Sequence, residues 1–89
     1  MQYARVVNIE YKSEDDLIAF VAKWEKWCPE NMPEAISRHM VKTGPKTSLL
    51  MAVYNSQAIA EEAGIVAEKF LNGAHHIHDM IAFDGEVLM

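Results

Sequence analysis

The chain has 89 residues, of which 13 are acidic and 8 are basic, so its formal net charge is −5. This length is typical of one domain, which we expect to span residues 1–89, and an apolar content of 51% is too high for a disordered tail. The acidic balance disfavours nucleic acid as a partner, because phosphate binding needs a basic face. The sequence has no apolar run long enough to cross a membrane, so we expect no membrane partner either.

Cysteine content bears on the cellular compartment. The single cysteine, Cys28, cannot form an internal disulfide. The first ten residues alternate in polarity and do not resemble a secretory signal. Together these features predict a cytoplasmic protein.

The apolar content also bears on assembly. A chain of this size buries only about 60–65% of its unfolded surface, so its own core is thin. Half of its residues are nevertheless apolar. The surplus indicates a partner subunit or an enclosed ligand, and we expect a homodimer.

The first third of the chain predicts a strand followed by a helix. Residues Gln2–Tyr11 have apolar side chains on both faces, which is typical of a central strand covered on both sides. Ser13 is expected to cap a helix over about residues 14–28, with Asp16 as the reciprocal partner of that cap. Pro29 is expected to end the helix, because proline cannot continue it.

The middle of the chain predicts a hairpin. Strands two and three are predicted from about Glu34 to Lys42 and from about Thr47 to Tyr54, and Leu49 to Tyr54 is apolar on both faces. The intervening segment Thr43-Gly44-Pro45-Lys46 contains glycine and proline, which favour a turn.

A second helix and a fourth strand complete the pattern. Asn55-Ser56 and Asn72-Gly73 are helix start and stop signals. Gly64 lies inside this helix and costs about 1 kcal/mol relative to alanine, which indicates close packing there. His75 to Phe83 predicts the fourth strand, and Asp84-Gly85 predicts a turn before a short extended tail.

The resulting order is βαββαβ. This order resembles the ferredoxin-like fold. The resemblance also rests on the two capped helices, the segment Val53-Tyr54-Asn55-Ser56, the histidines at the start of strand four and the ending Phe83-Asp84-Gly85-Glu86-Val87-Leu88. More narrowly, the sequence resembles the dimeric α+β barrel superfamily, which includes antibiotic-biosynthesis-monooxygenase-like proteins. The resemblance implies an α+β fold with an antiparallel sheet, two helices on one face, and pairing as a dimeric barrel.

The resemblance also implies a pocket between the sheet and the helices. The leading hypothesis is therefore a homodimer that binds an apolar small molecule, such as a fatty-acyl or other lipophilic metabolite. The side chains expected to bind this ligand are Asn8, Val21, Trp24, Met51, Phe70, His75 and Met80.

Two other classes of function remain open. One is a cofactor-free monooxygenase or isomerase, in which Asn8 and one of His75, His76 or His78 orient the substrate or move a proton. The residues singled out as catalytic candidates are Asn8, His75 and His78. The other class is an interaction module that binds no ligand.

The histidines of the predicted fourth strand bear on metal and haem chemistry. His76 and His78 lie two residues apart in a predicted strand and therefore share a face, which suits two zinc ligands. A third ligand, His39, would have to come from the other subunit. The haem-degrading branch of the superfamily uses an Asn on strand one, a Trp in helix two and a His before strand four. Asn8 and His75 (or His76) match this pattern, but helix two has no tryptophan, so we expect no haem or other cofactor. Two histidines alone are a weak metal motif, so we expect no metal either.

Three further side chains have structural interpretations. Arg5 is expected to pair with a carboxylate across the dimer. Trp24 and Trp27 form an aromatic patch at helical spacing, which is typical of a core. Cys28 is disfavoured as a nucleophile, because it lies at a helix C-terminus where the dipole opposes a thiolate.

Overall fold

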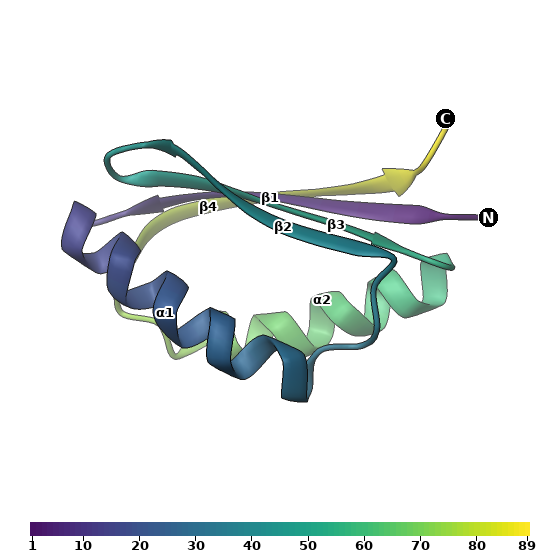
Figure 1. Cartoon of the computed structure of the whole chain (residues 1–89), viewed down its shortest axis with the longest axis horizontal. Helices are drawn as coiled ribbons and strands as arrows, with labels where there is room; N and C mark the ends of the chain where they lie inside the picture. The colour runs from purple at the N-terminus through teal and green to yellow at the C-terminus, as the bar shows by residue number, and fades with distance from the viewer.

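The computed structural model describes all 89 residues as one four-stranded sheet with two helices. The elements, in chain order, are β1 (Tyr3–Tyr11), α1 (Glu14–Asn31), β2 (Ser37–Gly44), β3 (Thr47–Tyr54), α2 (Gln57–Asn72) and β4 (Ile77–Glu86). The strand order is β2-β3-β1-β4, and every neighbouring pair is antiparallel. Both helices lie against one face of the sheet (Figure 1). The predicted βαββαβ topology is confirmed. No helix is both long and apolar enough to span a membrane.

The ends of the two helices follow from their capping residues. Ser13 Oγ accepts a hydrogen bond from the backbone N–H of Asp16 at 3.1 Å, and Ser56 Oγ accepts one from Ile59 at 3.3 Å. At the other end of α2, Gly73 donates its backbone N–H to Phe70 O. These contacts satisfy backbone groups that a helix end leaves unpaired.

Helix α1 continues past Pro29 to Asn31, so the predicted end at residue 28 is wrong. Proline removes one N–H from the helical ladder, but the last turn has other donors. Met32 N–H donates to Cys28 O at 2.9 Å, and the Asn31 side-chain amide donates to Trp27 O at 2.8 Å. These two bonds hold the turn that follows the proline.

Two predicted turns differ from the structure. Strand β2 begins at Ser37 and extends to Gly44, so only Pro45 and Lys46 separate it from β3. Strand β4 runs through the predicted turn at Asp84-Gly85, because β1 offers pairing partners that far: Asp84 pairs with Arg5 and Gly85 with Ala4.

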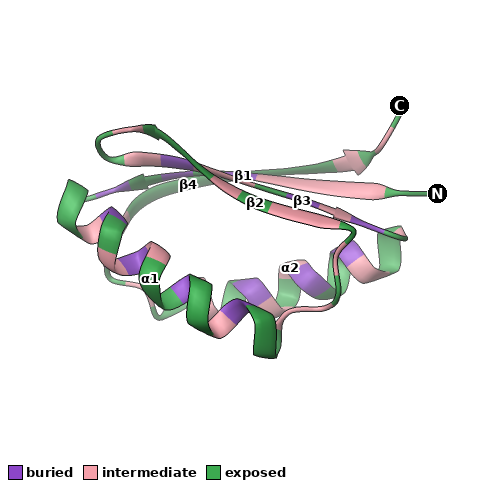
Figure 2. Ribbon diagram, viewed as in Figure 1, coloured by how far each residue is buried: buried purple, intermediate pink, exposed green.

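The helix-facing side of the sheet carries the core (Figure 2). Alternate residues of β1, namely Val7, Ile9 and Tyr11, are buried beneath the helices. The residues between them point to the other side, where Asn8 and Glu10 are exposed. In the single chain, β1 is thus covered on one face only, which corrects the expectation that both faces are covered.

The buried layer has a bulky end and a small end. Near the start of α1, Tyr11, Phe20, Trp24 and Phe70 pack with ring centroids 5.5–6.5 Å apart, and Tyr11 Oη hydrogen-bonds Ser48 Oγ at 2.8 Å. A second buried cluster contains Tyr54 and three alanines, Ala52, Ala60 and Ala63. The alanines leave space that the aromatic end does not.

Candidate ligand-binding site

Both arginines of the chain point into the layer between sheet and helices. The register places Arg38, Ala52, Arg5 and Asp84 side by side on four adjacent strands, all on the helix-facing side. Strands lie about 4.8 Å apart, so the Cα atoms of the two arginines are about 10 Å apart. Ala52 lies between them and is 4% exposed. A small residue flanked by two long ones creates a gap in this row.

That gap is a largely apolar cavity of about 30 Å³. It has room for about two or three water molecules, since about 10–15 Å³ of such volume holds one. Ligand sites enclose roughly ten times more space. The lining side chains are apolar apart from the two arginines: Val7, Ile9, Phe20, Trp24, Met32, Leu50, Ala52, Tyr54, Ala63, Ala67, Leu71, Met80 and Ala82.

Arg38 is held at one end of the cavity without an acidic partner. Its Nη2 donates to Pro33 O at 2.8 Å and to Tyr54 Oη at 3.3 Å, and its Cζ lies 5.7 Å from the centre of the Tyr54 ring. Its Nε is buried and has no hydrogen-bond partner. A buried cationic donor without a partner is unfavourable, so this atom marks an unmet interaction.

Arg5 lies at the other end and is paired. Its Nη1 lies 3.5 Å from Asp84 Oδ2 of the same chain, which corrects the expectation of a carboxylate across the dimer. A Cβ at Gly64 would come within 2.7 Å of this Nη1. The glycine in α2 therefore makes room for the guanidinium, which explains the close packing that the sequence indicated.

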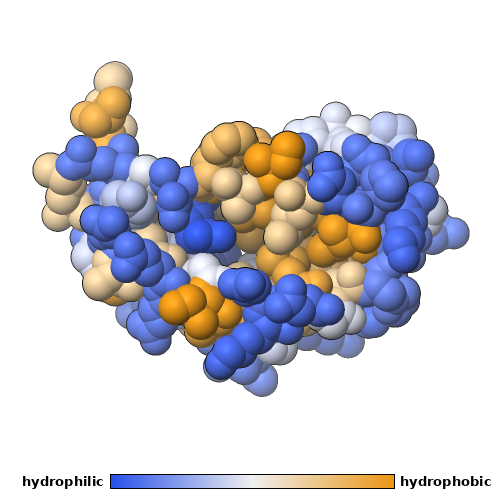
Figure 3. All heavy atoms as spheres, turned by 180° about the vertical axis from the view of Figure 1, so that it is seen from behind, coloured by the Kyte–Doolittle hydropathy of each residue, from blue (hydrophilic) through white to orange (hydrophobic).

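Two surface grooves share walls with the cavity. One, of about 460 Å³, lies between α1 and β2 and has Trp24, Arg38 and Leu50 in common with it. The other, of about 580 Å³, lies between α2 and β4 and has Arg5 and Met80 in common with it. Figure 3 shows the molecule from the side of α2 and β4, where apolar atoms surround a hollow between the sheet and the helices.

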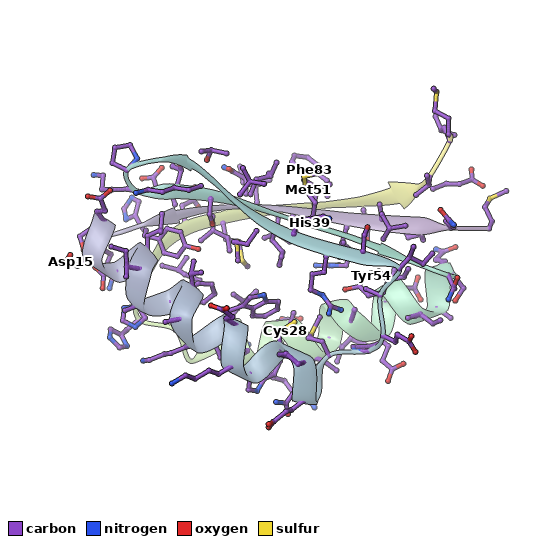
Figure 4. All side chains as sticks on the ribbon, in the orientation of Figure 1. Asp15, Cys28, His39, Met51, Tyr54 and Phe83 are labelled. Atoms are coloured by element: carbon purple, nitrogen blue, oxygen red, sulfur yellow. The ribbon has the colours of Figure 1, made fainter.

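Cys28 lies near Arg38 at the floor of the α1–β2 groove. Figure 4 shows Cys28 and Tyr54 on opposite sides of the space between α1 and the sheet. Burial raises the pKa of the Cys28 thiol above its ordinary value, and the Arg38 guanidinium only partly opposes that shift. The thiol is therefore protonated at neutral pH and is a weak nucleophile.

The predicted ligand-binding residues do not converge on one site. Trp24 and Met80 line the cavity, and Val21 lines the α1–β2 groove. Phe70 and His75 line a separate groove between the two helices. Met51 does not line the cavity, because β3 directs it to the opposite side of the sheet (Figure 4).

Asn8 is the other predicted residue outside the layer. It is exposed on the same side as Met51, and it pairs with Leu49 and Ile81 on the neighbouring strands. Within one chain, Asn8 and His75 therefore do not act on the same molecule. Both faces of β1 are apolar in the sequence, so alternation alone did not show which face the helices cover.

The histidines are also separated. His76 precedes β4, and its Nδ1 lies 2.8 Å from Asp16 Oδ1 on α1. The side chain of His78 is 65% exposed and lies 3.8 Å from Glu10. His39 lies on the sheet face opposite the helices (Figure 4). No three His, Cys, Asp or Glu side chains of the chain form a metal-binding group, and His76 and His78 do not share a face as predicted, because His76 turns toward α1.

Arg38 is the site residue that the sequence analysis missed. Its signal was the alternation of Arg38, Met40 and Lys42 in β2, which places all three on the helix-facing side once the register with β3 is known. From the sequence alone, β2 was placed too early in the chain, at Glu34.

The sheet face opposite the helices, which we call the open face, is rich in exposed apolar side chains. Phe83 is 64% exposed, Ile81 49%, Val41 45% and Met51 42%. These four side chains come from β2, β3 and β4. Strand β1 adds Val6, which lies in register between Phe83 and Met51. A contiguous apolar face of this kind is typical of an interaction surface.

No family model and no curated protein matches this chain. Solved structures do match over almost its whole length. A dimeric ferredoxin-like protein from an uncultured marine organism has a TM-score of 0.76 at 14% identity, over 99% of this chain and 96% of the other. A protein of unknown function from Nitrosomonas europaea has a TM-score of 0.75 at 20% identity, over 99% and 90%.

A third match is SnoaB, a cofactor-independent oxygenase from Streptomyces nogalater. Its TM-score is 0.70 at 8% identity, over 99% of this chain and 94% of the other. These similarities establish the ferredoxin-like fold and confirm the predicted likeness to dimeric ferredoxin-like and antibiotic-biosynthesis-monooxygenase-like proteins.

The contact between His76 and Asp16 gives a testable pH dependence. The hydrogen bond from His76, followed by that from the Ser13 hydroxyl, lowers the pKa of Asp16 below its ordinary value of 3.8. The unfolded chain binds this proton more readily, so the contact stabilises the fold above pH of about 4 and is lost as the pH falls through the lowered folded pKa.

We expect the urea midpoint of Asp16→Asn to fall less steeply with acidification between about pH 5 and pH 2 than that of the wild type. Asp15→Asn is the matched control, because Asp15 is exposed on the same turn and makes no side-chain hydrogen bond. Parallel pH profiles for Asp16→Asn and the wild type would contradict the assignment.

Proposed function

We propose that this chain forms a cytoplasmic homodimer that binds an apolar small molecule between its sheet and its helices. The observation that carries the proposal is the apolar cavity beneath Ala52, together with the α1–β2 groove that shares its walls. The cavity alone is too small for a metabolite, so the body of the ligand would lie in the groove and one end would enter the cavity. The groove supplies apolar contacts from Val21, Met40 and Leu50.

The open face supports the homodimer. Its exposed apolar side chains on β2, β3 and β4 have no covering element within the chain. Proteins of the same fold are described as dimeric. Pairing of two open faces would bury these side chains and leave the helices and both grooves at the outside.

We expect the wild-type protein to have twice the chain mass of 10.1 kDa in light scattering, and Phe83→Lys to shift it toward the monomer, because a charge would be buried in the interface. Ile65→Lys is the matched control: Ile65 is 60% exposed, but on α2. A monomeric wild type, or a Phe83→Lys variant that stays dimeric, would argue against this interface.

Ligand binding can be tested with 1-decanol, an uncharged apolar probe. We expect calorimetric titration to show saturable binding, and Val21→Gln to weaken it about tenfold, because burying a valine side chain contributes about 1.5 kcal/mol. Ile18→Gln should leave the affinity unchanged, since Ile18 is 58% exposed on the same helix and lines no groove. If the wild type binds neither 1-decanol nor decanoic acid, the chain is better described as an interaction module without a ligand.

A second candidate function is a cofactor-free oxygenase. Its support is the likeness in fold to SnoaB, which is described as a cofactor-independent oxygenase. Within this chain the available proton acceptor is His75, which lies in the groove between the helices beside His76 and Lys23. Asn8 would join it only through the second subunit.

The test is oxygen uptake by the purified protein supplied with a hydroquinone. We expect uptake above the buffer rate, a loss of at least tenfold in His75→Ala, and no change in the control His39→Ala, because His39 does not line the groove between the helices. Unchanged uptake in His75→Ala, His76→Ala and His78→Ala alike would exclude histidine-dependent catalysis.

A further inference from the structure

We propose that the ligand carries a carboxylate, which binds the Arg38 guanidinium at the end of the cavity. This inference rests on the proposed function, because it specifies the chemistry of a ligand in the same site. The ligand class is then an apolar chain or ring with a single carboxylate.

The first argument is the unmet hydrogen bonding of Arg38. One of its terminal nitrogens, Nη2, has protein acceptors, the carbonyl of Pro33 and the hydroxyl of Tyr54. Its Nε is buried and has none. The other terminal nitrogen, Nη1, forms no hydrogen bond or ion pair within the chain. A carboxylate oxygen can therefore accept a charge-assisted hydrogen bond from Nη1 without displacing Pro33 or Tyr54.

The second argument is charge. The chain has only two arginines, and both line this cavity. Arg5 is paired with Asp84, whereas Arg38 forms no ion pair with any carboxylate of the chain. A half-buried cation without a counter-ion favours an anion far more than an exposed one does.

The third argument is space. The volume of about 30 Å³ next to Arg38 suits a group of one or two oxygen atoms better than an alkyl chain, since it equals that of about two waters. Tyr54 is only 1% exposed, and its hydroxyl accepts from Arg38. Its own proton is free to bond a carboxylate oxygen, so Tyr54 is a second donor at this end.

The surroundings restrict the ligand to one negative charge. Glu25 lines the α1–β2 groove, and the chain as a whole carries a net charge of −5. Both disfavour phosphates and other multiply charged anions. Val21, Trp24 and Leu50 supply apolar walls for the rest of the ligand, and His39 also borders the groove.

The test compares decanoic acid with 1-decanol, which have the same chain length and differ in the head group. At pH 7 we expect the wild-type protein to bind decanoate at least tenfold more tightly than 1-decanol in calorimetric titration. Arg38→Gln should abolish this preference, so that the affinities of the variant for decanoate and 1-decanol agree within about twofold, because the charge-assisted bonds act on the carboxylate alone. Arg5→Gln is the control: it removes the other arginine of the cavity, and the preference should persist.

Each outcome separates the two proposals. Equal affinity for decanoate and 1-decanol in the wild type overturns the carboxylate and leaves the apolar site standing. Binding of neither probe overturns the proposed function itself. A preference that survives in Arg38→Gln and is lost in Arg5→Gln assigns the anion to Arg5 and overturns the role of Arg38. Because the wild-type comparison needs no variant, it remains decisive if Arg38→Gln fails to fold.

Discussion

The difference in side-chain size along the buried layer determines where this molecule encloses a cavity. At one end, Phe20 and Trp24 fill the space between α1 and the sheet with aromatic rings. At the other end, Ala52 and Ala63 are too short to meet across the same distance. Regular helices and strands keep the layers at a nearly fixed separation, so short residues on both sides leave a gap. The two arginines enter the layer at this gap and give an otherwise apolar cavity its only charges.

The sequence was sufficient for the topology, because that depends on local signals. Ser13 and Ser56 marked both helix starts, and periodicity separated strands from helices. It was not sufficient for the site. Asn8 and Met51 were assigned to the pocket although they lie on the open face, since strands with two apolar faces do not reveal which one the helices cover. Arg38 was missed for a related reason: its direction depends on the register between β2 and β3, which is a property of two strands and not of one.

The open face and the core between sheet and helices use separate side chains of the same strands. In β1, Val7 and Ile9 face the helices, whereas Val6 and Asn8 face the other way. The two-residue repeat of a strand lets one segment serve a core and an assembly surface with separate sets of side chains. This accounts for the excess of apolar residues over what the core of a single chain needs, because only 14 residues are buried in it. Substitutions on β1 can therefore alter the core or the open face separately.

The proline in the last turn of α1 has a consequence for the motion of this molecule. Because Pro29 has no amide hydrogen, the carbonyl of Glu25 lacks the donor that a helix normally provides four residues later. Both residues border the α1–β2 groove. The helical wall of the groove is thus held by one hydrogen bond fewer than the rest of α1, and local opening at this end costs less free energy than opening elsewhere along the helix. Amide hydrogen exchange is therefore expected to be faster in this last turn than in the middle of α1.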